Sequence, residues 1–274
     1  MRRVISVLVC GTLFLAGCAR HAETKVPGPG PFDITNAMRI LFGNYDSVIK
    51  ASLYRVPQGT VQDPNFADKN EIRARSFFVQ DTTENGVHKY YVLTWAKPAG
   101  QPFDCQGCAP LISAAVFVPS SNGWQLESVG RAAIVFGDFG KPPEAQLVQV
   151  GPQHHAFLLR STTNQAKTTT SQALLVPWNG NVHDAMQWVA AHSNQDDCGG
   201  AYPCFGYQRD LKFVPAPNSE YDDIVLTLSG TDMAQKAPFH LHKVSGTERL
   251  RFQDGKYVQV EKTGQTVMAE RQPH

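Results

Sequence analysis

Runs of β-branched and aromatic residues, separated by short polar segments, dominate this chain from residue 72 onward. Asn-Gly and Asp-Gly dipeptides stand between or beside these runs, and both tolerate the positive φ that tight hairpin turns require. The pattern predicts a mainly β fold that is antiparallel and hairpin-rich, with a few short helices. A sandwich-like sheet or a curved meander fits the pattern, and a propeller-like arrangement is the alternative. The β-prone runs are residues 76–80, 89–95, 111–118, 124–129, 173–178, 250–253 and 256–261, and the dipeptides are Asn85-Gly86, Asn122-Gly123, Asn179-Gly180 and Asp254-Gly255.

The last of these hairpins is the most sharply defined. Only two residues separate its runs, so the expected turn sets Phe252 opposite Tyr257. Residues 81–86 mimic the start of an EF-hand loop, but Val92 stands where a calcium loop needs its bidentate Glu. We therefore interpret residues 81–86 as a hairpin tip.

Two segments show helical spacing instead. Residues 33–42 predict a short helix with Asp33 or Thr35 as its N-cap. Residues 181–192 predict a second helix, and residues 45–55 fit either a helix or a strand. The apolar positions that recur in the second helix are Val182, Ala185, Met186, Val189 and Ala190.

Residues 88–129, 154–178 and 222–260 share a loose design. Each gives an apolar strand, a polar loop and a second apolar strand near a Gly turn. The spacing is roughly 65 residues, which is longer than common propeller blades. Hairpins in any β protein look alike, so the similarity also fits hairpins that are not repeats.

The first residues have the layout of a secretory signal. Arg2 and Arg3 precede an apolar stretch at 4–15, and the small residues Ala16 and Gly17 follow it. The stretch is too short for a membrane span of about 20 residues. An exported chain is therefore expected.

Leu15-Ala16-Gly17-Cys18 at the end of this signal resembles the lipobox of bacterial lipoproteins. The resemblance implies cleavage after Gly17 and a lipid on the Cys18 thiol, and acyl chains at about 0.8 kcal/mol per buried CH₂ make a firm anchor. Ala rather than Asp follows Cys18, which by the same resemblance favours the outer membrane, facing either the periplasm or the cell surface. An ordinary signal peptide that contains a cysteine is the alternative.

The chain divides into three parts on this interpretation. Residues 1–17 are the signal peptide, 18–31 form a lipidated Pro/Gly-rich tether, and 32–274 form a single globular domain. Hydrophobic residues make up 42% of the chain and charged residues 18%. We see no basic stripe and therefore expect no nucleic-acid partner, and no motif indicates a cofactor.

The cysteines that remain after processing form an even set. Cys105, Cys108, Cys198 and Cys204 are expected to form disulfides in an exported protein. Their spacing favours the local pairs Cys105–Cys108 and Cys198–Cys204 over crossed pairs. A redox C-x-x-C pair or a zinc site is an alternative interpretation. However, no βαβ pattern surrounds Cys105, and the spacing between Cys198 and Cys204 is unusual for a zinc site.

The stretch from 198 to 207 is a candidate recognition loop. A disulfide would hold Tyr202, Phe205 and Tyr207 on a short Gly/Pro loop, and rigid aromatic side chains lose little entropy when they bind a protein or a sugar. The alternative is that these rings fold over the sheet.

The sequence contains no established catalytic motif. The histidine pairs 154–155 and 240/242 are interpreted as strand residues rather than metal ligands. The favoured function is a lipid-anchored envelope protein that binds or scaffolds an envelope protein or glycan. An envelope hydrolase is the alternative, and a purely structural lipoprotein comes third. The loop carboxylates available to a hydrolase are Asp196, Asp197, Asp222 and Asp223.

Overall fold

The structure is a computed structural model, and it describes residues 30–56, 61, 63–67, 71–100, 102–164, 167–195, 198, 199, 203–233 and 240–265. Strands make up most of it, as the sequence predicts. The elements are α1 (Ile34–Phe42), β1 (Ser52–Tyr54), α2 (Pro64–Ala67), β2 (Ile72–Glu84), β3 (Val87–Pro98), β4 (Leu111–Ser120), β5 (Gly123–Val135), β6 (Glu144–Gly151), β7 (His154–Asn164), β8 (Thr168–Trp178), β9 (Asn181–Ser193), β10 (Gly206–Val214), β11 (Asp223–Met233), β12 (Leu241–Gln253) and β13 (Lys256–Gln265).

Three antiparallel meanders follow one another along the chain. The first meander is β2–β5, the second is β6–β9 and the third is β10–β13. A single parallel pair, Val129 with Asn181, joins β5 to β9, and β9 then pairs with β10. The path through the described strands runs from β1 to β13 and does not close. The prediction of a hairpin-rich, curved antiparallel meander is therefore confirmed.

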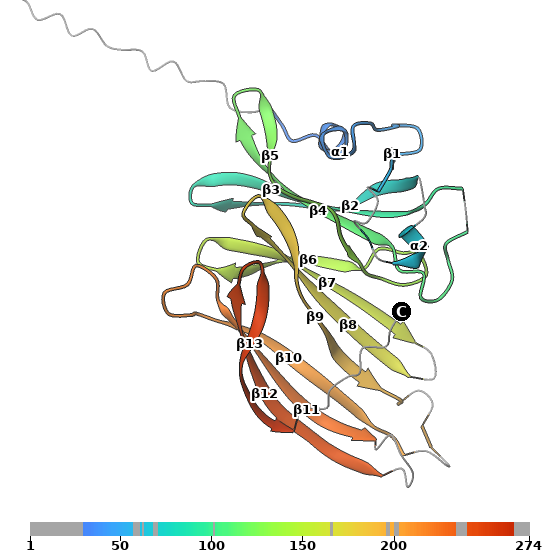
Figure 1. The fold of residues 1–274 in the computed structure, drawn as a ribbon, viewed down its shortest axis with the longest axis vertical. Helices are drawn as coiled ribbons and strands as arrows, with labels where there is room; N and C mark the ends of the chain where they lie inside the picture. The colour runs from blue at the N-terminus through green and yellow to red at the C-terminus, as the bar shows by residue number, and fades with distance from the viewer. Residues whose placement is uncertain are drawn as a thin grey trace, which may run out of the picture.

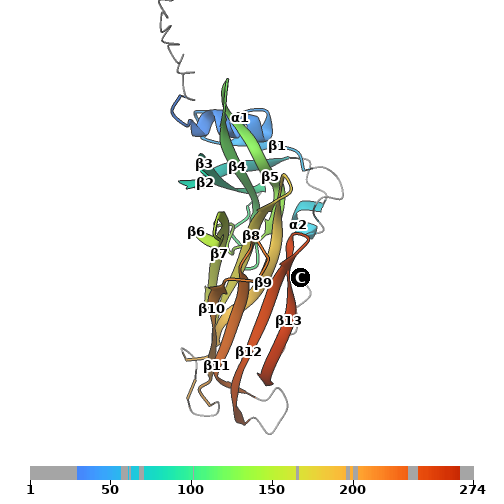
Figure 2. The ribbon, with the colours of Figure 1, turned by 90° about the vertical axis from the view of Figure 1, so that its left-hand side faces the viewer.

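The meanders lie one below another along the long axis of the molecule, from α1 at one end to β10–β13 at the other (Figures 1 and 2). Neighbouring residues of β7 and β8 point to opposite faces of the second meander, and both faces are buried. Phe157 and Leu175 belong to a core shared with the first meander, whereas Leu158 and Leu174 belong to a core shared with the third. A strand buried on both faces reads as a continuous apolar run rather than an alternation.

Helix α1 covers the outer face of the first meander. Its Met38 and Leu41 pack with Val92 and Phe117 of that sheet. Of the two predicted N-caps, Asp33 is the one that forms: its carboxylate accepts a hydrogen bond of 2.9 Å from the backbone N–H of Thr35. In the described residues no helix has the length and apolar character needed to span a membrane.

Three of the four Asn-Gly and Asp-Gly turns form as expected. In the fourth, Ser121 and Asn122 make the turn, and Gly123 begins β5 opposite Ser120. Asn85, Asn179 and Asp254 have φ of 50°, 49° and 49°, and the glycine after each also has a positive φ. Two successive residues with positive φ form a two-residue hairpin turn whose twist matches that of the flanking strands. The last turn pairs Phe252 with Tyr257, as the sequence predicts.

The predicted helix at 181–192 is wrong, because this segment is strand β9. Two irregularities in its pairing with β8 leave Ala185 and Ala190 without register partners. Each extra residue breaks the alternation of strand faces. Apolar residues on both faces, combined with these breaks, produce the spacing that imitates a helix. The segment 45–55 is a strand only over Ser52–Tyr54.

The three similar segments found in the sequence fall at matching places in the topology. Residues 91–94, 157–160 and 224–227 lie on β3, β7 and β11, which are the second strands of their meanders. Each meander also has its Asn-Gly or Asp-Gly dipeptide at or near the turn between its third and fourth strands.

Candidate functional site

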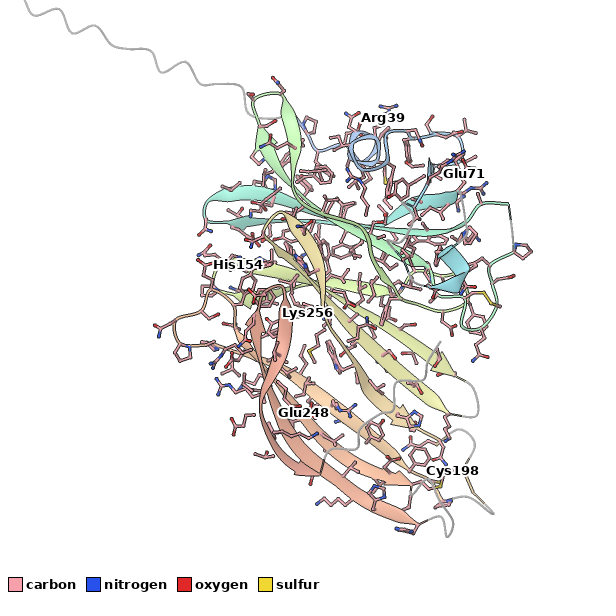
Figure 3. The ribbon with its side chains drawn as sticks, in the orientation of Figure 1. Arg39, Glu71, His154, Cys198, Glu248 and Lys256 are labelled. Carbon is pink, nitrogen blue, oxygen red and sulfur yellow. A yellow bond between two sulfur atoms is a disulfide. The ribbon has the colours of Figure 1, made fainter. Side chains whose placement is uncertain are left out.

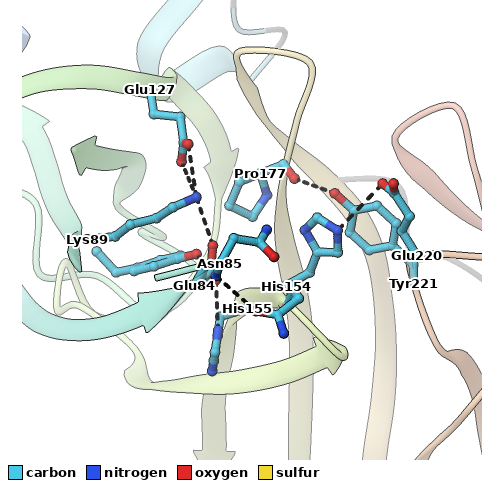
Figure 4. A network of polar contacts seen from close by, with 11 residues as sticks. Glu84, Asn85, Lys89, Glu127, His154, His155, Pro177, Glu220 and Tyr221 are labelled. Atoms are coloured by element: carbon cyan, nitrogen blue, oxygen red, sulfur yellow. Dashed lines mark hydrogen bonds and ion pairs between the residues drawn. The ribbon is translucent and has the colours of Figure 1, made fainter. Parts of the chain in front are cut away.

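A hollow of about 290 Å³ lies where the three meanders meet. The β2–β3 hairpin and β5 line one side, and the start of β7 with the β8–β9 turn lines another. Glu220 and Tyr221, which precede β11, complete the wall. Figure 4 shows polar side chains from these segments pointing toward one another.

Glu84 is the centre of this polar network and is only 3% exposed. Its carboxylate accepts hydrogen bonds from the Tyr91 hydroxyl at 2.5 Å and from the Lys89 Nζ at 2.9 Å. The third donor is the Nδ1–H of His155 at 2.7 Å, because an ionised carboxylate can only accept. Burial alone would raise the pKa of Glu84, but these hydrogen bonds outweigh burial and hold the pKa below its usual value.

Lys89 connects Glu84 to the more exposed Glu127. Its Nζ lies 2.9 Å from Glu84 and 2.8 Å from Glu127. Burial would lower the pKa of Lys89, but its hydrogen bonds to the two carboxylates raise the pKa instead. Lys89 is therefore a cation held between two anions.

His154 and Tyr221 form the opposite wall. Their rings stack with centroids 4.4 Å apart, and the Nε2 of His154 lies 3.6 Å from the Glu220 carboxylate. The Tyr221 hydroxyl donates to the backbone carbonyl of Pro177 at 2.9 Å. Burial, followed by the nearby charge of Glu220, raises the pKa of Tyr221 to about 12.

The backbone brings these walls close together at Gly151. A Cβ at this position would lie 2.1 Å from the carbonyl oxygen of Glu220, so only glycine fits. The N–H of Asp222 then donates to the carbonyl of Val150 at 2.7 Å. On the other side, the Gln153 side chain accepts from the N–H of Asn85 at 2.9 Å.

The arrangement suits binding better than catalysis by Glu84, because three donors already surround that carboxylate. The accessible acceptors are Glu127 and Glu220, whose side chains are 39% and 84% exposed. They can accept hydrogen bonds from hydroxyl or amino groups of a ligand, while the half-buried Trp178 offers a ring. Among the described residues, no group of three or more His, Cys, Asp or Glu side chains is arranged to hold a metal ion.

Both predicted local disulfides are present. Cys105 pairs with Cys108 and Cys198 pairs with Cys204. They lie in the β3–β4 and β9–β10 connections, away from the hollow. Figure 3 labels Cys198 at the end of the molecule opposite α1.

Two of the three predicted recognition residues are buried. Phe205 and Tyr207 both lie near the His192 ring, with centroids 5.5 and 5.7 Å away. The backbone N–H of Phe205 also donates to the Asn194 side chain at 2.8 Å. These rings pack onto β9 and β10, whereas Tyr202 lies outside the described residues.

The carboxylates proposed for a hydrolase do not line the hollow in the described part of the chain. Asp223 is fully buried and paired with Arg249 and Arg251. Burial and the neighbouring Asp223 raise the pKa of Asp222. Asp196 and Asp197, like Cys18 of the lipobox, lie outside the described residues.

Residues 81–86 form the predicted hairpin tip, because β2 ends at Glu84 and β3 begins at Val87. Within this hairpin, the His88 Nε2 lies 2.9 Å from the Asp81 carboxylate. The rings of His240 and His242 have centroids 6.5 Å apart. His154 and His155, interpreted from the sequence as ordinary strand residues, are the pair that lines the hollow.

Glu84, Lys89 and Glu127 were not predicted from the sequence as site residues. Glu84 directly precedes an Asn-Gly turn, where an acid is ordinarily solvated, and its partner His155 is 71 residues away. The adjacent histidines were the one visible signal.

The fold and site together define an open, three-meander β protein with a polar hollow at the junction of its sheets. No protein-family model matches the chain, and no match was found among curated proteins or solved structures.

Proposed function

We propose that this chain is a lipid-anchored protein of the bacterial cell envelope and that its hollow binds an envelope glycan. The observation that carries the binding proposal is the charge network of Glu84, Lys89 and Glu127 beside an open hollow. The lipobox-like sequence at Cys18 supports the anchor and favours the outer membrane.

The ligand chemistry follows from the lining. Three carboxylates face one lysine and two histidines, so the hollow favours hydroxyl and amino donors over anions. The walls are fixed by hydrogen bonds before any ligand arrives, which reduces the entropy lost on binding. The sugar hydroxyls and peptide amino groups of a peptidoglycan fragment are such donors, and we propose that its peptide carboxylates lie outside the hollow. Hydrolysis by Asp222 and Asp223 draws no support from their surroundings.

Replacing Glu127 by Gln is expected to weaken binding of a soluble peptidoglycan fragment about tenfold, because a charged acceptor is lost, equivalent to about 1.4 kcal/mol. Isothermal titration calorimetry of the purified mature chain measures this. Glu144→Gln is the matched control, since Glu144 is exposed on β6 and does not line the hollow. Equal affinity of the two variants, or no saturable binding by the wild type, would contradict the glycan site.

Replacing Cys18 by Ser is expected to move the protein from the membrane fraction to the soluble or unprocessed fraction, and to abolish acyl labelling. Cys10→Ser is the control, because Cys10 lies in the signal sequence and should leave anchoring unchanged. Membrane fractionation and labelling that do not change in Cys18→Ser would refute the anchor.

A further inference from the structure

Exposed apolar side chains lie at the end of the molecule that carries α1. Val48 is 89% exposed, and its neighbour Ile49 and Ile40 of α1 are also exposed. We call these three side chains the end patch. Figures 1 and 2 place α1, and the loop that follows it, at one end of the long axis. Single exposed apolar residues are ordinary, so the patch needs further evidence to carry meaning.

The loop that presents Val48 has a defined structure. Asp46 and Ala51 form a bridge through two backbone hydrogen bonds of 2.9 and 3.2 Å. The Asp46 carboxylate accepts from the N–H groups of Val48 and Ile49 at 2.8 and 3.2 Å. Their side chains are therefore held outward by the fold, not exposed by fraying.

The described chain begins at the same end. Gly30 accepts a hydrogen bond from the Trp124 indole at 2.9 Å, and Phe32 stacks on Tyr90 at 4.1 Å. Cys18 precedes Gly30 by 12 residues, a reach of at most about 43 Å. A lipid on Cys18 would keep the end patch near the membrane surface.

Basic side chains accompany these apolar ones. The described residues 30–56 contain three basic and two acidic residues. Arg39, Lys50 and Arg55 are exposed on or next to α1 and the loop, and Figure 3 labels Arg39 at this end. Basic residues beside apolar ones are attracted to anionic lipid headgroups.

We propose that the end patch contacts the bilayer, with Val48 and Ile49 entering the headgroup region and the basic residues meeting anionic lipids. This inference rests on the proposed Cys18 anchor for its biological setting. The contact sets the long axis of the molecule upright on the membrane and holds the third meander away from it. The lipid restricts where the protein is, and the patch restricts how it is oriented.

The test uses the mature chain with Cys18→Ser, so that no lipid contributes, and flotation with vesicles of phosphatidylethanolamine and phosphatidylglycerol. Adding Val48→Asp is expected to lower vesicle partitioning about tenfold, or about 1.4 kcal/mol. Val258→Asp is the matched control, because Val258 is a 45% exposed valine on β13 in the third meander. Both valines are exposed, so unfolding temperatures should stay close to that of the parent chain. Replacing phosphatidylglycerol by phosphatidylcholine should weaken binding of the parent.

Two results would contradict the proposed membrane contact of the end patch. One is that the parent chain does not partition onto vesicles, and the other is that Val48→Asp and Val258→Asp lower partitioning equally. The anchor is judged separately, by fractionation of the Cys18→Ser and Cys10→Ser proteins in cells. If the acylated protein fractionates with membranes but its lipid-free form does not bind vesicles, the membrane contact of the end patch is refuted and the Cys18 anchor is supported.

Discussion

Replacing Glu84 by Ala is expected to lower the free energy of unfolding by about 3–5 kcal/mol, the usual cost of removing one partner from a buried charge network. The change leaves the Tyr91 hydroxyl, the Lys89 ammonium and the His155 imidazole without their shared acceptor. Tyr91 is almost fully buried, so water cannot readily replace the carboxylate there. Urea denaturation followed by intrinsic fluorescence measures the loss.

Milder substitutions separate charge from shape at this site. Glu84→Gln keeps the volume but not the charge, and it should cost about 1–3 kcal/mol, less than Glu84→Ala. Glu144→Ala is the surface control and should stay within about 0.5 kcal/mol of the wild type. If Glu84→Ala is as stable as the control, the network does not hold the first two meanders together.

Replacing Asp223 by Ala is expected to cost about 2–3 kcal/mol of unfolding free energy. The carboxylate is fully buried, and it accepts from Arg249 at 2.7 Å and from Arg251 at 3.1 Å. Both arginine side chains are partly exposed, so they regain water when Asp223 is lost, and the cost is smaller than for Glu84. Asp210→Ala, at an exposed position of β10, is the control.

The pH dependence of stability gives a second measure of Asp223. Hydrogen bonds from Arg251 outweigh burial and, with those from Arg249, hold the pKa of Asp223 below its usual value. A lowered pKa means that the stabilisation is fully present above the unfolded-state pKa of about 4 and is lost as the pH falls through the folded-state pKa. The wild type should therefore lose stability below about pH 4 more steeply than Asp223→Asn. Parallel curves for the two proteins would argue against an ionised, paired Asp223.

The turns and the strands were largely predictable because their signals are local. Asn179-Gly180 and Asp254-Gly255 specify hairpins through the φ angles of adjacent residues. The short helix was predictable because Asp33 caps it and an apolar face follows. Such features need no knowledge of distant parts of the chain.

Strand β9 was predicted wrongly because its pattern depends on distant neighbours. The first meander packs on Val182, whereas Ala185 and Met186 pack in the core shared with the third. The sequence of β9 alone does not show that both faces of the strand are buried. It also does not show that the pairing with β8 is irregular at Ala185 and Ala190. The polar hollow was missed for the same reason, since the contact of Glu84 with His155 joins two meanders.

The junctions between meanders share a construction that explains where the hollow lies. The β8–β9 turn of the second meander reaches β5 of the first, where the N–H of Val129 donates to the carbonyl of Gly180 at 3.1 Å. The β12–β13 turn of the third meander reaches β9 of the second, where a Cβ on Gly255 would lie 3.1 Å from the His183 ring. The hollow lies beside the first of these junctions.

The central claim is that the hollow binds a glycan, and the most direct test is a ¹⁵N-histidine NMR titration of the mature protein with a soluble peptidoglycan fragment. We predict saturable shifts at the His154 and His155 imidazoles, which line the hollow. The NMR signals of the His192 imidazole, which is half-buried on β9 beside Phe205, should not shift. Absence of saturable shifts at His154 and His155, or saturable shifts confined to histidines outside the hollow, would contradict the claim.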